Sequence, residues 1–183
     1  ATRVAETTSG VLVEFASGET LTADGVVIAT PPAPAAHLLR DVAAEAAHDL
    51  AAIRTVSTAV IALVIDAPLP FPPGMGHGYV VPRSAGREIV AVTISTRKFP
   101  QSAPPGRHIV RVFIGRDGEP NPLDRSDANL IEIAQTELQR MLGLTAAPTT
   151  ALVTRWPDAI PQYGLGHRGR IARVRARHGL RRR

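Results

Sequence analysis

The stretch Val56-Ser57-Thr58-Ala59-Val60-Ile61-Ala62-Leu63-Val64-Ile65 is the longest strongly apolar run of the chain. Its many β-branched residues favour a strand, and a continuous apolar run is typical of a strand that other parts of the protein cover. It is about ten residues long, whereas a helix that crosses a membrane needs about 20. We therefore expect a long buried strand over Val56–Asp66 and no segment that spans a bilayer.

Downstream of this run the sequence predicts more strands and one clear helix. The helix is expected over Asp124–Leu142, where apolar side chains recur at helical spacing, with Asp124 or Ser126 as the cap and Gly143 at its end. The other downstream expectations are a surface loop at Pro68–Gly78, strands at Tyr79–Val81, Glu88–Thr96, His108–Ile114 and Thr149–Trp156, an irregular segment at Pro157–Gly169 and a basic helix that begins over Ile171–Arg177.

Upstream of the run the first thirty residues predict strands. Val11–Phe15 alternates apolar and polar side chains, Ser17-Gly18 supplies a turn and Thr20–Ala23 leads back, which is typical of a hairpin. The β-branched run Val26-Val27-Ile28-Ala29 is expected to be a strand that is covered on both faces.

Between these strands and the central run, Ala33–Ile53 carries leucine, valine and isoleucine among alanines at mainly helical spacing. This pattern predicts two short helices, broken near Arg40-Asp41. The expected fold class is a mixed α/β (α+β) arrangement: a strand pair, followed by a mostly antiparallel sheet with helices on one face.

The amino-acid composition excludes several classes of protein. The 183 residues are 44% hydrophobic and 20% charged, which indicates a globular chain. The absence of cysteine excludes a disulfide scaffold, an iron–sulfur cluster and a thiol nucleophile. The first residue is not methionine and no signal-peptide pattern follows, so we expect a start inside a longer reading frame.

The net charge of +5 is concentrated at one end. Eight arginines and no acidic residue lie from Gly166 onward, which leaves 13 basic and 16 acidic residues in the first 165. Such a distribution does not predict a basic face that binds nucleic acid, although an arginine-rich tail could act as a polyanion-binding module.

Motifs for self-contained catalysis are weak. Gly164-Leu165-Gly166-His167-Arg168-Gly169 matches G-x-G-x-x-G, but seven residues separate it from the predicted strand, so we interpret it as a glycine-permitted turn. The six histidines have no metal-ligand spacing, and no metal site is expected. Neither a G-x-S-x-G elbow nor a suggestive pair of acids is present, so if the chain is an enzyme, something other than its own side chains carries the chemistry.

One segment stands out for its aromatic side chains. Trp156, the only tryptophan, and Tyr163 lie within eight residues of each other, in a stretch that also holds Asp158 and Gln162. Two interpretations stay open: an aromatic plug over a sheet edge, or a segment that closes over a flat aromatic ligand.

This segment, Trp156-Pro-x-Ala-Ile-Pro161-Gln162-Tyr163-x-x-Gly166-His167, resembles a stretch that marks the protoporphyrinogen and coproporphyrinogen oxidases. Ala23–Pro31 is similar to the family's strand that ends in Ala-Thr-Pro beside FAD, a feature shared with flavin amine oxidases. Shorter resemblances follow in order at Ser57–Val64, Gly78–Arg83, Val110–Gly115 and Leu142–Leu144, so that the likeness runs from about residue 3 to about 175.

The resemblance implies an FAD enzyme of haem biosynthesis, in which the flavin takes hydrides from a porphyrinogen and passes them to dioxygen. It implies four segments: part of the FAD-binding domain (residues 1–31), the substrate-binding domain (32–156), a return segment (157–175) and an aberrant Arg-rich tail (176–183). The family's opening G-x-G-x-x-G and its late glycine-rich segment are missing here, so the resemblance describes a truncated piece, expected to be inactive alone.

The resemblance also implies site residues. FAD would contact Thr30, Pro31 and Trp156, and the tetrapyrrole would contact Gly78, Tyr79, Val80, Arg83 and Phe113. The partners would be the porphyrinogen and dioxygen, and the location cytoplasmic, with peripheral membrane contact open. The alternatives are a flavin monoamine oxidase and a non-catalytic remnant.

Overall fold

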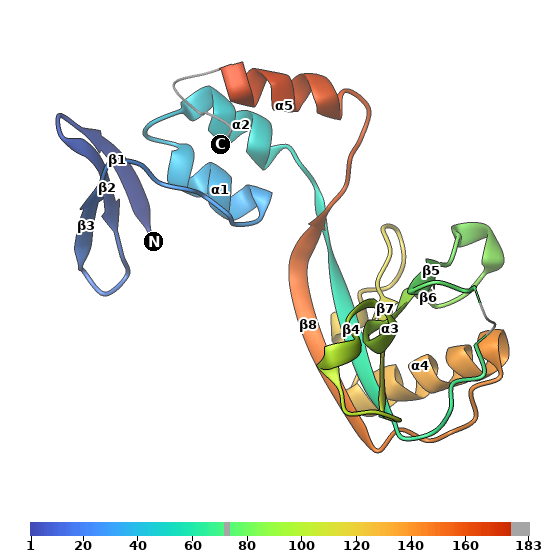
Figure 1. Ribbon diagram of the computed structural model, residues 1–183. Helices are drawn as coiled ribbons and strands as arrows, with labels where there is room; N and C mark the ends of the chain where they lie inside the picture. Colours follow the sequence, from blue (N-terminus) through green and yellow to red (C-terminus); the bar gives the residue numbers. More distant parts are fainter. Residues whose placement is uncertain (72–73, 177–183) are drawn as a thin grey trace. The chain divides into compact units, whose positions relative to one another are not determined.

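The computed structural model describes residues 1–71 and 74–176 (Figure 1). The chain divides into two compact units. The first unit combines Ala1–Thr55 with the described residues from Ile160 onward, and the second is Val56–Ala159. Residues 32–55, which we expected in the substrate-binding domain, therefore pack with the first unit.

The first unit opens with a three-stranded antiparallel sheet, β1 (Arg3–Thr7), β2 (Gly10–Glu14) and β3 (Thr20–Ala23). The predicted hairpin is β2 and β3, and β1 is an additional strand that pairs with β2. Val4 lies opposite Val13, and both are buried.

The expectation of a strand at Val26–Ala29 is wrong. These residues have no regular structure, and the side chain of Val27 is 91% exposed. A strand exists only where a neighbour accepts and donates its backbone hydrogen bonds, and no strand in the described part of the chain pairs with this run. The β-branched composition favours an extended backbone but cannot supply that partner.

Three helices complete the first unit: α1 (Pro32–Leu39), α2 (Ala44–Ala51) and α5 (His167–Ala176). The predicted break between α1 and α2 is confirmed, and small side chains such as Ala43, Ala46 and Ala47 form their shared core. A bidentate ion pair ties α5 to α2, with Arg173 Nη2 and Nε at 2.6 and 3.0 Å from the carboxylate of Asp49.

The second unit is built on a five-stranded sheet in the order β5-β6-β7-β4-β8. Neighbours in β5, β6, β7 and β4 pair antiparallel. The strands are β4 (Thr55–Ile65), β5 (Gly78–Val80), β6 (Ile89–Ile94), β7 (His108–Ile114) and β8 (Thr150–Pro161). The central strand expectation is thereby confirmed, and the sheet is mostly antiparallel as predicted.

One face of this sheet packs against α4 (Asp127–Leu142), as Figure 1 shows. The helix begins after Ser126, whose hydroxyl accepts a hydrogen bond from the Asn129 amide at 3.2 Å, and ends at Gly143 in the left-handed conformation. Leu130, Ile133, Ala134 and Leu138 join the core, and Glu137 is buried with them at 4% exposure. The predicted helix and both caps are confirmed.

Short helical turns connect the strands: η1 (Arg83–Ala85), α3 (Ser95–Lys98), η2 (Pro100–Ser102) and η3 (Pro122–Asp124). Because α3 begins at Ser95, β6 is shorter than the expected Glu88–Thr96 strand. The predicted loop at 68–78 is confirmed in its described residues, but Phe71 turns inward and is buried.

The chain between Pro157 and Gly169 differs from the expected irregular segment. Strand β8 continues to Pro161, and α5 begins at His167. Prolines remove backbone donors, yet an edge strand tolerates them on its unpaired side, and β8 is the edge of the sheet.

Among residues 1–71 and 74–176, no helix is long and apolar enough to cross a membrane. The Arg-rich tail expected over residues 176–183 lies outside the described residues, apart from Ala176 at the end of α5.

We expect Leu130→Ala to destabilise the second unit by about 2–5 kcal/mol, because the side chain is fully buried and the surroundings cannot fill the cavity. Trp156 is the only tryptophan and lies in this unit, so its fluorescence during urea unfolding reports on that unit alone. Leu152→Ala, at a 63% exposed position, is the control and should change stability by less than about 0.5 kcal/mol. Equal effects of the two substitutions would contradict the assigned core.

The carboxylate of Asp49 should stabilise the first unit at neutral pH and lose this effect in acid. The hydrogen bond from Arg173 holds the pKa of Asp49 below its ordinary value of 3.8. A carboxylate with a lowered pKa stabilises the folded state above its unfolded pKa, and the stabilisation disappears as pH falls through the folded pKa.

Melting curves followed by circular dichroism test this expectation. Asp49→Asn should melt lower than the parent at neutral pH, and the difference should shrink below pH 3.8. The exposed Asp24, for which the described residues show no ion pair, gives the control Asp24→Asn. A difference that is constant with pH would rule out the ion pair as its cause.

Candidate functional site

The five-stranded sheet has one buried face and one half-exposed face. Along β7, Val110, Val112 and Ile114 are buried, while the residues between them keep part of their surface exposed. The same alternation runs along β4. Successive side chains of a strand point to opposite faces, so the half-exposed residues share the face opposite α4. We call this the open face; it includes Val60, Ala62, Val64, Val80, Ala91, Thr93, Ile109, Arg111 and Phe113.

An apolar row crosses the open face. Val80 pairs with Ala91, Ala91 with Phe113, and Phe113 with Val60, on four successive strands. Val80 is 76% exposed although it is a large apolar residue. The structure thus places two of the sequence-predicted substrate residues, Val80 and Phe113, in one row on one surface.

Trp156 belongs to the same face of the sheet. Its neighbour Arg155 turns toward α4 and binds the carboxylate of Asp127, and Val153 packs into the core. Alternation then places Trp156 on the opposite side of β8, where it is 52% exposed. The tryptophan is therefore no core residue of the second unit, and its ring is available to a ligand.

Tyr79 and Gly78 have structural contacts in β5. The Tyr79 side chain packs against the core with α4, and its hydroxyl lies 3.9 Å from the sulfur of Met141. Burial raises the pKa of Tyr79 to about 12. Gly78 allows the backbone to approach β6, because a Cβ there would lie 2.1 Å from the carbonyl oxygen of Val92. The Tyr79 side chain therefore does not share the surface of Val80 and Phe113, and Gly78 adds no side chain to it.

Arg83 lies in η1, beyond the end of β5, and is exposed. Its guanidinium donates to the backbone carbonyl of Asp117, in the loop that follows β7. This contact joins two loops at the end of the sheet. This contact gives Arg83 a structural role.

Thr30 and Pro31 lie in the first unit, beside a cleft of about 270 Å³. The Thr30 hydroxyl donates to the carbonyl of Pro31 at 3.4 Å. The cleft is lined mainly by apolar side chains, with His37 and Thr30 as polar members, and with these neighbours: Ala1, Val4, Val13, Val26, Val27, Ile28, Ala29, Pro34 and Leu38. Such a lining fits a flat aromatic ring, but it offers no arginine or lysine for a pyrophosphate, so it fits only part of an FAD molecule.

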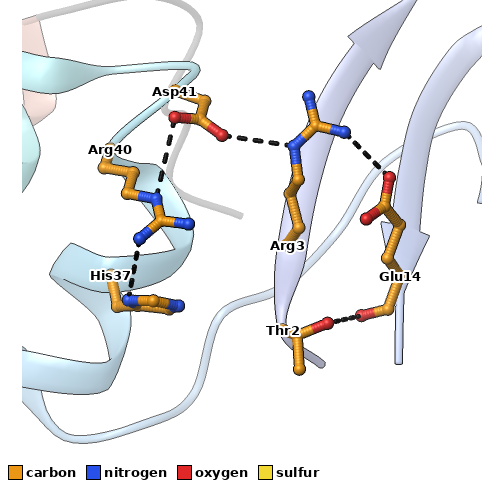
Figure 2. Close-up of polar contacts among 6 residues, drawn as sticks. All are labelled: Thr2, Arg3, Glu14, His37, Arg40 and Asp41. Carbon is orange, nitrogen blue, oxygen red and sulfur yellow. Dashed lines mark hydrogen bonds and ion pairs between the residues drawn. The ribbon is translucent and has the colours of Figure 1, made fainter. Parts of the chain in front are cut away.

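A chain of polar contacts holds the elements around this cleft (Figure 2). Arg3 of β1 donates to Glu14 of β2 at 2.8 Å and to Asp41 after α1 at 3.2 Å. Arg40 lies 3.7 Å from Asp41 and 3.4 Å from Nδ1 of His37. All of these groups are solvent-exposed, so each pair contributes little to stability, and their role is to connect sheet and helix.

Two arginines of the sheet were not singled out by the sequence as site residues. Arg116 is 12% exposed and donates to the carbonyls of Val81 and Ile89, which is a structural role. Arg111 lies on the open face, with its guanidinium carbon 5.9 Å from the ring centre of Phe113. The sequence did contain one signal for Arg111, because a cation stood at an outward position of an otherwise apolar strand. The residues beside Arg111, however, are set by the pairing of β7 with β4 and β6, which are distant in the sequence.

Metal binding has no support in the geometry. In the part of the chain that the structure describes, no three His, Cys, Asp or Glu side chains are grouped so as to hold a metal ion.

Comparison with known proteins gives consistent results. The model of the flavin-containing amine oxidoreductase family matches residues 1–181. The chain is 32% identical to coproporphyrinogen III oxidase of Bacillus subtilis over 180 residues, which are 95% of this chain and 37% of that protein. It is 33% identical to chloroplastic protoporphyrinogen oxidase 1 of Spinacia oleracea over 78% of this chain and 27% of that protein.

Among solved structures, a provisionally assigned protoporphyrinogen oxidase from Exiguobacterium sp. 255-15 superposes with a TM-score of 0.71 at 30% identity. The match covers 95% of this chain and 37% of that one. The chain thus spans between about a quarter and little more than a third of the length of these relatives. Because the family match covers nearly all of its residues, the chain belongs to the flavin-containing amine oxidoreductase family.

Proposed function

We propose that this chain forms most of the substrate-binding part of an FAD-dependent porphyrinogen oxidase, together with a portion of its FAD-binding part. The observation that carries the proposal is the 32% identity to a coproporphyrinogen III oxidase over 95% of the chain. The block from Trp156 to His167, which resembles the porphyrinogen oxidases, lies within that match.

The substrate would be coproporphyrinogen III or protoporphyrinogen IX, and the electron acceptor dioxygen, in haem biosynthesis in the cytoplasm. When bound, FAD would supply the redox chemistry of hydride transfer from the porphyrinogen to dioxygen, with hydrogen peroxide as the second product. The chain's own residues bind, orient and shield the reactants. No acid–base residue of the chain is assigned to the reaction.

The open face suits a flat, apolar macrocycle. Val80 and Phe113 present apolar surface from neighbouring positions in one row, and such a wall favours binding by removing that surface from water. Trp156, on the same face, would offer ring area to the flavin. Thr30, which lines the apolar cleft, and its neighbour Pro31 would contact another part of FAD. These five residues are the proposed contacts of substrate and FAD.

A flavin monoamine oxidase is the alternative enzyme. Putrescine oxidase matches with a TM-score of 0.63 but only 17% identity, and a likeness at that level describes the fold alone. The two sequence relatives described above bear porphyrinogen oxidase names, and this favours the porphyrinogen as substrate.

A segment exchange tests the proposal. Residues 1–176 replace the matching segment of the Bacillus subtilis coproporphyrinogen III oxidase, and flavin content and porphyrin formation are measured. We expect a yellow protein that oxidises coproporphyrinogen and leaves putrescine unchanged. A folded, flavin-loaded hybrid that turns over an amine and no porphyrinogen would overturn the assignment, and one that turns over neither would support a non-catalytic remnant.

The 183-residue chain by itself should bind FAD weakly or not at all. Tight binding needs a glycine-rich turn and a helix N-terminus for the pyrophosphate, and the cleft beside Thr30 offers only a site for an aromatic ring. The measurement is the flavin absorbance that stays with the protein through gel filtration. Stoichiometric yellow protein would contradict this expectation.

Phe113→Ala in the active hybrid should raise KM for the porphyrinogen by about tenfold, because burial of a phenylalanine side chain contributes roughly 1.5–3 kcal/mol. The melting temperature should change less, since Phe113 lies on the half-exposed face. Phe99→Ala, at a 48% exposed position outside the strands, is the matched control. An unchanged KM for Phe113→Ala would exclude this residue from the substrate site.

A further inference from the structure

Arg111 occupies the middle of the open face. It lies on β7, and its register partners are Ala62 on β4 and Thr93 on β6. It is thus one row away from the apolar row of Val80, Ala91, Phe113 and Val60. Its guanidinium lies over the ring of Phe113, at 5.9 Å from the ring centre, which restricts where its donors can point.

Arg111 has no ion pair among the described residues, and its charge contacts only the ring of Phe113. Its Nε atom is shielded from solvent and makes no hydrogen bond. A shielded donor of a charged group without an acceptor is costly, and natural proteins rarely keep one without a reason.

Three other arginines on or beside the sheet donate hydrogen bonds to carboxylates or backbone carbonyls. Arg107 binds both carboxylate oxygens of Asp66 at 2.7 and 2.9 Å. Arg155 binds Asp127, and Arg116 binds backbone carbonyls and Glu119. Arg111 differs from these three because its neighbours on the open face are apolar or carry a hydroxyl.

A ligand that fits this arrangement is apolar over most of its area and has an anion at its edge. If its flat part covers the row that contains Phe113, its edge reaches the next row, where Arg111 stands. A planar guanidinium presents paired N–H donors that match the two oxygens of a carboxylate. A sulfate-like or phosphate-like anion would lack the flat apolar part.

We propose that Arg111 binds a propionate carboxylate of the porphyrinogen and makes the site selective for tetrapyrroles that carry a propionate at that edge. This inference rests on the proposed function and adds a specificity residue to it. Coproporphyrinogen carries propionates on all of its pyrrole rings, whereas protoporphyrinogen has vinyl groups on part of them, so Arg111 favours coproporphyrinogen.

Binding to the full 183-residue chain tests the proposal without any turnover. The probes are coproporphyrin III, the air-stable oxidised form of the substrate, and its tetramethyl ester, which has the same ring and no charge. Binding is read from the porphyrin absorbance and emission. We expect the unmodified chain to bind the acid about tenfold more tightly than the ester, as expected for one charge-assisted hydrogen-bonded contact.

Arg111→Gln should weaken binding of the acid about tenfold and leave the ester unchanged, and Arg111→Lys, which keeps the charge but not the fork, should lie between them. Arg107→Gln is the matched control, because Arg107 is already paired with Asp66, and it should bind like the parent. Trp156 emission checks that each variant is folded, and the comparison of acid and ester in the unmodified chain stands even if a variant fails to fold.

The outcomes distinguish a failure of the role of Arg111 from a failure of the porphyrinogen assignment. Tight binding of both probes, with no effect of Arg111→Gln on the acid, would overturn the role of Arg111 and leave the porphyrinogen assignment intact. Failure of the unmodified chain to bind either probe would overturn the porphyrin site on the open face, and the inference with it.

Discussion

The packing of α4 against one face of the five-stranded sheet is the constraint on which the second unit depends. Leu130, Ala134 and Leu138 cover the inward side chains of β4, β6 and β7, and this helix leaves the other face of the sheet uncovered. The apolar side of α4 stabilises the sheet by packing against one of its two faces. The side chains on the other face are not needed for this packing and can vary with function. The same alternation that builds the core thereby separates it from the candidate site.

The first unit is held together differently. Its core between α1 and α2 consists mainly of alanines, which bury little apolar surface each, and ion pairs supplement it at its edges. Exposed ion pairs position more than they stabilise, as Arg3 does between β1 and Asp41. The Arg-rich composition of α5, which from sequence alone raised the question of polyanion binding, has an internal use in the described residues, where Arg173 binds Asp49.

The sequence predicted those helix and strand bounds that depend on residues close together in the chain. The bounds of α4 follow from Ser126 and Gly143, and β7 follows from its alternation. The other strand bounds depend on pairing between strands that are distant in the sequence. Val26–Ala29 is not a strand because no described strand lies beside it, whereas β8 continues through prolines because it is an edge. At the candidate site, the pattern of β5 could not tell which of Tyr79 and Val80 turns to the helix.

The left-handed backbone at Asp158, with a φ of 46°, lies near the end of β8, where the Asp158 amide donates to the Ser57 hydroxyl at 3.0 Å. This contact brings the first and last residues of the second unit together. Val56–Ala159 is thus inserted within the sequence of the first unit, and the two ends of the inserted segment lie side by side. Adjacent junctions of this kind mean that the segment could be cut out or replaced with little strain on the chain that flanks it.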